Sequence, residues 1–156
     1  MIYNSKARRN LIARQSGNHL HDFPQLLIGW RGEVACEFER ESTSLKAGVI
    51  AVVPDGVDHY FSGLDDKSEL LVVDISPVDP FLSALEDACN FSFKEALFNQ
   101  SAFVLTAPDI QPILEFAGSQ LEKSIGINPQ LNCQLTTLFL TQICQENRPE
   151  SSLLLK

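Results

Sequence analysis

The three histidines of this 156-residue chain are the residues whose types and spacing best suit chemistry. His19 and His21 are two positions apart, so on a β-strand both side chains point to the same face. Gln25 has the same parity and shares that face. With His59 they supply three imidazoles and one amide oxygen, a donor set that suits a first-row transition metal. A histidine pair at this spacing is a weak signal when taken alone.

The residues around the histidines make the signal more specific. Two segments resemble the paired signature motifs of the cupin superfamily, without insertions: His19-x-His21-x3-Gln25-x6-Gly32 and Gly48-x5-Pro54-x-Gly56-x2-His59-x3-Gly63. The resemblance implies a small β-barrel whose mouth holds the motif side chains. His19, His21, Gln25 and His59 are then the candidate metal ligands and ligand-binding residues.

Three positions depart from the cupin pattern. Ala13 stands where the first motif opens with glycine, Gln25 replaces the usual glutamate, and Gly63 replaces asparagine. Losing the glutamate removes a negative ligand, which weakens binding of a divalent cation. We therefore expect at most one weakly held transition metal (Zn, Ni, Fe or Mn), released below about pH 6 as the imidazoles protonate. Without metal, the same side chains are expected to bind a polar small molecule or an anion.

The amino-acid sequence within the two motifs is similar to that of one cupin family in particular. The segments 19–32 and 53–59 resemble the N-terminal sensor domain of AraC-type transcription regulators, in which an aromatic residue and a glutamine commonly follow the histidine pair. Phe23 and Gln25 match those positions. The resemblance implies a barrel followed by dimerising helices, then a linker and two helix-turn-helix motifs. The chain ends at Lys156, where that linker would begin, so we expect the DNA-binding half to be missing.

Residues 10–76 carry the strand signals that such a barrel needs. Val34, Cys36 and Phe38 alternate with polar residues, which is the period of a half-buried strand. The apolar runs 49–53 and 70–75 are each closed by a proline-containing turn. Many short strands at close spacing predict a mainly β protein, here a cupin-like (RmlC-like jelly-roll) barrel.

The segment after residue 78 is predicted to be helical. Asp79-Pro80 and Asn128-Pro129 have the N-cap and first-turn pattern of helix starts. We expect helices from 80 to about 89, from about 108 to 123, and from 129 to about 146. The predicted organisation is a barrel with an N-terminal arm (1–78), helices that pack on it (79–147) and a linker-like tail (148–156).

The last predicted helix is apolar on more than one face. Leu131, Leu135 and Leu138 form one seam, and Leu140 and Cys144 lie roughly opposite. One face can cover the barrel, and the seam can meet a second copy of the chain as a homodimer. The alternative is that both faces pack within one subunit.

Composition limits the partners of the chain. It has 12 basic and 20 acidic residues, a net charge of −8, which argues against direct binding of nucleic acid or an anionic membrane. No apolar run approaches the ~18 residues of a membrane span, and the N-terminus lacks a secretory signal. The four cysteines form no CxxC pair, which is typical of reduced thiols in a cytoplasmic protein.

These observations favour a small-molecule-sensing and dimerisation domain of an AraC-type regulator, without DNA-binding motifs of its own. The alternatives are a stand-alone metal-dependent cupin enzyme, such as a dioxygenase or isomerase, and a non-catalytic binding or storage protein. The motifs contain no second carboxylate or lysine as an obvious general base, so an enzyme is less favoured. Phe23 and Phe61 are candidate ligand contacts, with a place in the barrel core as the alternative. Trp30 is interpreted as a packing or dimer contact, with a pocket lid as the alternative.

Overall fold

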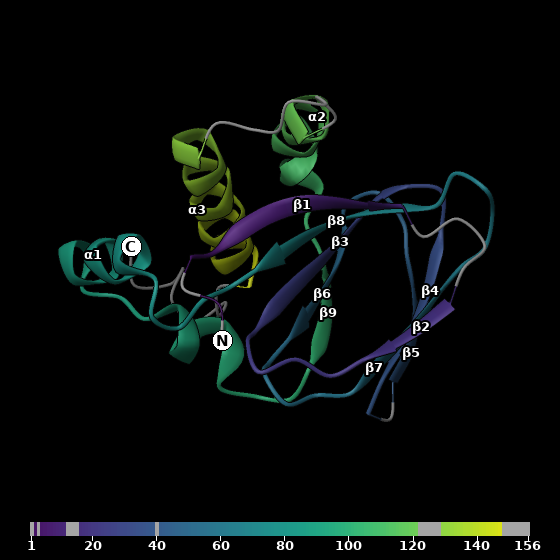
Figure 1. The fold of residues 1–156 in the computed structure, drawn as a ribbon, viewed down its shortest axis with the longest axis horizontal. Helices are drawn as coiled ribbons and strands as arrows, with labels where there is room; N and C mark the ends of the chain where they lie inside the picture. Colours follow the sequence, from purple (N-terminus) through teal and green to yellow (C-terminus); the bar gives the residue numbers. More distant parts are fainter. Residues whose placement is uncertain (1, 3, 12–15, 40, 122–128, 148–156) are drawn as a thin grey trace, which may run out of the picture.

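The chain folds into two antiparallel sheets and a helical layer (Figure 1), in a computed structural model that describes residues 2, 4–11, 16–39, 41–121 and 129–147. The larger sheet has the order β1 (Lys6–Leu11), β8 (Glu69–Asp74), β3 (Gln25–Arg31), β6 (Val49–Val53) and β9 (Phe103–Thr106). The smaller sheet has the order β2 (Ser16–His19), β7 (His59–Gly63), β4 (Val34–Phe38) and β5 (Glu41–Leu45). This arrangement confirms the predicted mainly β, jelly-roll-like barrel with a C-terminal helical segment.

The larger sheet is buried on both faces. Leu27, Val53 and Val72 pack toward the smaller sheet and form the interior of the barrel with Phe38 and other residues. The alternate residues on the same three strands pack against the helices. A strand covered on both sides has no polar face, which is why the runs 49–53 and 70–73 are apolar throughout.

The helices follow the predicted starts closely. They are α1 (Pro80–Cys89), the π-helix η1 (Lys94–Phe98), the 3-10 turn η2 (Pro108–Ile110), α2 (Gln111–Leu121) and α3 (Pro129–Glu146). The predicted N-cap at Asp79 is confirmed, because its Oδ1 accepts a 2.9 Å hydrogen bond from the Phe81 amide. Its Oδ2 accepts another, also 2.9 Å, from the Ser5 amide, so one buried carboxylate joins the start of α1 to the residue before β1. The predicted cap at Asn128 lies outside the described residues.

Two strands were not predicted. Residues 6–11 were interpreted as part of an arm, but they pair with β8 along the full length of β1. Asn132 on α3 exchanges two hydrogen bonds, of 2.9 and 3.0 Å, with the backbone of Ala7, so it covers part of this edge strand. β9 lies within the segment predicted to be helical and pairs with β6. Its four residues are too few to show a period in the sequence.

The seam predicted on α3 is divided by the structure. Leu135 is 1% exposed and belongs to the core between the larger sheet and the helices, as does Leu140. Leu138 is 50% exposed. The seam of three leucines is therefore not one surface, because α3 packs on the barrel with part of that stripe.

Trp30 is a packing residue, as one of its interpretations predicted. Its indole is 7% exposed and lies against Gly118 of α2. The guanidinium groups of Arg9 and Arg31 lie over its ring at 4.5 and 4.1 Å from the centroid. Arg9 also forms an ion pair with Glu69, so this cluster fastens β1, β3 and β8 to α2.

The cysteines and the helices agree with two further predictions. All four cysteines are free. Within the part of the chain that the structure describes, no helix combines the length and the apolar character needed to cross a membrane.

Candidate functional site

Two of the three histidines meet at one end of the barrel. His21 lies between β2 and β3, and His59 opens β7. Their ring centroids are 5.5 Å apart, with the planes tilted by 42°. The Gly56 amide donates a 2.9 Å hydrogen bond to the His21 carbonyl, which ties the turn of the second motif to the first motif. The 54–56 turn therefore lies against the first motif and brings His59 close to His21.

The ring of His59 is oriented by its own turn. The imidazole is 3% exposed, and its Nδ1 lies 3.3 Å from the Val57 carbonyl oxygen. When Nδ1 carries the proton it donates to that carbonyl, and Nε2 is then the acceptor nitrogen of the ring. This is the arrangement by which backbone carbonyls commonly fix a ligating histidine.

The register of β2 against β7 is the observation that places His19 beside His59. The prediction that His19, His21 and Gln25 lie on one face of a single strand is wrong, because β2 ends at His19 and β3 begins at Gln25. Residues 20–24 form the connection between the two sheets. His19 pairs directly with His59 across β2 and β7. Its side chain lies outside the described residues.

Gln25 is buried at the same end of the barrel and makes a single hydrogen bond. It is 2% exposed, and its Nε2 donates to Asp74 Oδ1 at 2.7 Å. Its Oε1 is buried and has no partner among the described residues. A buried acceptor without a donor is costly, so this oxygen is available to a donor or a cation that a ligand supplies.

Asp74 and Arg8 belong to this site although the sequence analysis did not select them. The second carboxylate oxygen of Asp74 pairs with Arg8 Nε at 3.0 Å, so the buried carboxylate has two partners. One signal was present in the sequence: Asp74 interrupts the apolar run 70–75, and a charge inside a buried strand requires partners. Arg8 is distant in sequence and could not be assigned without the β1–β8 register.

The two aromatic candidates lie in different environments. Phe23 stacks on His21, with centroids 4.9 Å apart and planes at 27°, so it supports one imidazole of the pair. Phe61 is partly buried and packs against the barrel interior.

A recess opens beside His59. It has a volume of about 370 Å³ and lies between the end of β4 and the start of β7. Glu37, Glu39, Asp58 and Tyr60 line it together with His59. Three carboxylates therefore contribute to its lining, together with the imidazole of the buried His59.

The donors at the mouth fit a metal only in part. Two imidazoles and the unpartnered amide oxygen of Gln25 are present, and the Asp74 carboxylate is bonded to the amide nitrogen of Gln25. Among the described residues, no three His, Cys, Asp or Glu side chains gather closely enough to hold a metal ion. A cation here would therefore depend on His19 in addition to His21, His59 and Gln25 Oε1.

Comparison in sequence and comparison in structure give different results. No protein-family model matches the chain, and no curated protein matches it. Solved structures do match its fold. ToxT from Vibrio cholerae has a TM-score of 0.57 at 11% identity, over 94% of this chain and 58% of that chain. ToxT from Vibrio cholerae strain SCE256, bound to an unsaturated fatty acid, has a TM-score of 0.56 at 10% identity, over 93% and 56%.

A third match carries a functional description. The AraC-like transcriptional activator CuxR has a TM-score of 0.50 at 12% identity, over 86% of this chain and 49% of that chain. The chain thus spans little more than half the length of the ToxT structures and about half of CuxR. It has the jelly-roll-like barrel expected from the sequence, and it shares that fold with ToxT and the AraC-like CuxR over most of its own length.

Proposed function

We propose that this chain is the effector-sensing domain of an AraC-type transcription regulator and that it binds a small molecule at the barrel mouth. The observation that carries the proposal is the pair of imidazoles, His21 and His59, at the mouth of a barrel whose fold is shared with an AraC-like activator. The unpartnered Oε1 of Gln25 supports it, because a ligand donor would satisfy that oxygen.

The interior of the barrel limits the size of this effector. Leu27, Phe38, Leu45 and Leu70 fill the space between the sheets and are at most 4% exposed. The recess beside His59 measures about 370 Å³ and has three carboxylates on its wall. An unsaturated fatty acid, the class of molecule bound in one ToxT structure, is therefore disfavoured by both volume and charge. The effector class that fits is a small polar molecule that is neutral or cationic.

A weakly held divalent metal is the second part of the proposal. His21, His59, His19 and Gln25 Oε1 would hold it, and it would supply an open coordination position for the effector. The orientation of His59 by the Val57 carbonyl supports this assignment. Because all the nitrogen ligands must be neutral, we expect elemental analysis to find partial occupancy at pH 7.5 and loss below about pH 6. Full occupancy at pH 5 would contradict it.

The remaining features of the proposal concern partners. A homodimer through α3 would use the exposed Leu138. Direct contact with nucleic acid would fall to a separate domain, since the chain carries a net charge of −8. The four free thiols fit a reducing compartment such as the cytoplasm.

The genomic reading frame tests the regulator assignment. A frame that continues past Lys156 into two helix-turn-helix motifs is the expected result. A stop codon directly after Lys156 would contradict the assignment and would favour an enzyme or a storage protein.

Thermal unfolding tests the effector site itself. Polar metabolites below about 250 Da, in neutral, cationic and anionic sets, and oleate would be added to the wild type. We expect stabilisation by neutral or cationic compounds only, because binding to the folded state raises its stability. The stabilisation should be lost in His59→Gln and kept in Ser119→Ala, which changes an exposed position of α2 that lines neither cavity. Stabilisation by oleate alone, or by compounds that act equally on His59→Gln, would overturn the proposed site.

A further inference from the structure

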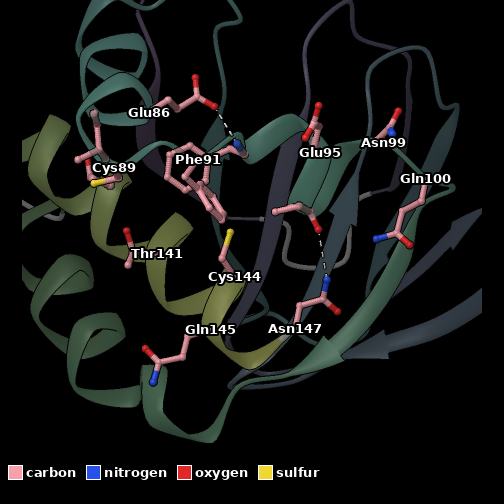
Figure 2. Close-up of a pocket in the computed structure, with 14 residues that line it drawn as sticks. Glu86, Cys89, Phe91, Glu95, Asn99, Gln100, Thr141, Cys144, Gln145 and Asn147 are labelled. Carbon is pink, nitrogen blue, oxygen red and sulfur yellow. Dashed lines mark hydrogen bonds between the residues drawn. The ribbon is translucent and has the colours of Figure 1, made fainter. Parts of the chain in front are cut away.

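A second cavity lies outside the barrel, in the helical layer. It has a volume of about 950 Å³ and is bounded by α1, the loop that follows it, η1 and the C-terminal half of α3 (Figure 2). None of the motif residues of the barrel mouth lines it. The volume lies within the range of ~300–1,000 Å³ that is usual for small-molecule sites.

One wall is an aromatic pair held in place by the end of α1. Asn90 ends the helix in the left-handed conformation with φ of 51°, and the Phe91 amide then bonds back to the Glu86 carbonyl at 3.0 Å. Phe91 and Phe93 meet edge to face with centroids 5.2 Å apart. Phe91 remains 43% exposed, so an aromatic ring with an accessible face lines the cavity.

The opposite wall is a stripe of α3. Thr137, Thr141 and Gln145 are spaced by four residues and therefore share one face of the helix. This face is distinct from the one that packs on the barrel through Leu135, Phe139 and Ile143. At the end of α3, Asn147 Nδ2 donates to the Ala96 carbonyl at 3.4 Å and joins this wall to η1. The cavity is thus framed by elements that are bonded to one another.

The charged side chains that the structure describes around the cavity are both acidic. Of the described residues, Glu86 and Glu95 line it, and no lysine, arginine or histidine does. Glu86 is fixed, because its Oε2 accepts a 2.7 Å hydrogen bond from the Phe93 amide. Cys144 adds no charge, since burial raises the pKa of its thiol to about 12 and keeps it protonated at neutral pH. An anionic guest would meet two carboxylates and no counter-charge.

We propose that this cavity is a second binding site, for a small apolar or aromatic molecule that is neutral or positively charged. The face of Phe91 would contact the apolar part or a cationic group, and the Thr141 hydroxyl would accept or donate a hydrogen bond. The site is independent of the barrel mouth, since the two share no lining residue.

Two fluorescent probes of one skeleton test the proposal. N-phenyl-1-naphthylamine is neutral, and 8-anilinonaphthalene-1-sulfonate carries a negative charge. We expect the neutral probe to bind the wild-type chain at least about tenfold more tightly than the anionic one. Thr141→Trp, which fills the cavity, should weaken the neutral probe by about tenfold or more. Gln134→Trp, at an exposed position of α3 that does not line the cavity, is the matched control and should bind as the wild type does.

Charge reversal gives a second readout that does not depend on filling the cavity. Glu95→Lys should lower the ratio of the neutral probe's affinity to the anionic probe's affinity, because it replaces a negative charge in the cavity lining by a positive one. His59→Gln should leave both affinities unchanged, so failure of the barrel-mouth proposal would not affect this one. Equal binding of the two probes, or equal binding of the neutral probe by Thr141→Trp and the wild type, would overturn the inference.

Discussion

The replacement of the usual cupin glutamate by Gln25 is explained at the residue scale by its neighbour. Gln25 Nε2 donates to Asp74 Oδ1 at 2.7 Å, a hydrogen bond that an ionised glutamate cannot donate. A glutamate in its place would set two carboxylates against each other in a buried position, with Arg8 as the one cationic partner that the described contacts provide.

We therefore expect Gln25→Glu to destabilise the fold by about 1–3 kcal/mol at pH 7.5, measured by urea unfolding. The like charges raise the proton affinity of the pair in the folded state, so stability should be lost as pH rises and partly restored near pH 5. The double variant Gln25→Glu/Asp74→Asn is the control, because it exchanges the two groups and should regain most of the loss. A variant as stable as the wild type at pH 7.5 would show that the two side chains are not coupled.

The cysteines give a second prediction at this scale. Burial, with a smaller effect of Glu37, raises the pKa of the Cys36 thiol to about 11, whereas Cys89 is exposed. At pH 8 only about one thousandth of Cys36 is thiolate, and the thiolate is the reactive form. Iodoacetamide followed by mass spectrometry should modify Cys89 and leave Cys36 and Cys144 unmodified. Labelling of Cys36 at the rate of Cys89 in the folded chain would contradict its burial.

At the element scale, the contact between β3 and α2 depends on the absence of a side chain. A Cβ on Gly118 would lie 2.2 Å from the Trp30 ring, so α2 can approach the sheet this closely only with glycine there. The arginines on both sides of the indole restrict its movement.

This contact reverses the usual effect of a glycine substitution in a helix. Gly118→Ala should destabilise by about 1–3 kcal/mol through overpacking, although alanine favours a helix by ~1 kcal/mol. Ser119→Ala at the next, exposed position is the control and should be neutral or slightly stabilising. Adding Trp30→Phe to Gly118→Ala should recover part of the loss. Unfolding by urea measures all three, and a stabilised Gly118→Ala would disprove the close contact.

At the scale of the whole molecule, the α3 surface carries the proposed homodimer. Leu138 is 50% exposed, whereas Leu135 is part of the core, so of these two leucines Leu138 is the one that can contact a second copy. Leu138→Asp should convert a dimer into a monomer in sedimentation velocity without changing the circular dichroism spectrum. Leu135→Asp, by contrast, should unfold the chain, because it buries a charge.

Phe116 on α2 provides the matched control for this experiment. It is also 50% exposed, so Phe116→Asp removes a similar apolar surface from another helix and should leave the dimer intact. A wild-type chain that sediments as a monomer at micromolar concentration would end the dimer proposal.

The sequence determined the features that depend on local order along the chain. The apolar runs 49–53 and 70–75 became β6 and β8, and Asp79-Pro80 became the start of α1, because alternation and capping involve residues that are close in sequence. The spacing of the second motif also indicated the turn that places His59 at the barrel mouth.

Only the tertiary structure decided which residues far apart in sequence contact these elements. The pairing of β1 with β8 brings Arg8 to Asp74, and the packing of α1, η1 and α3 creates the larger cavity. Periodicity shows that α3 has more than one apolar face, but it cannot tell which face meets the sheet. The reason is physical: burial is set by residues far apart in sequence, so Leu135 and Leu138 differ in exposure although they lie on one stripe.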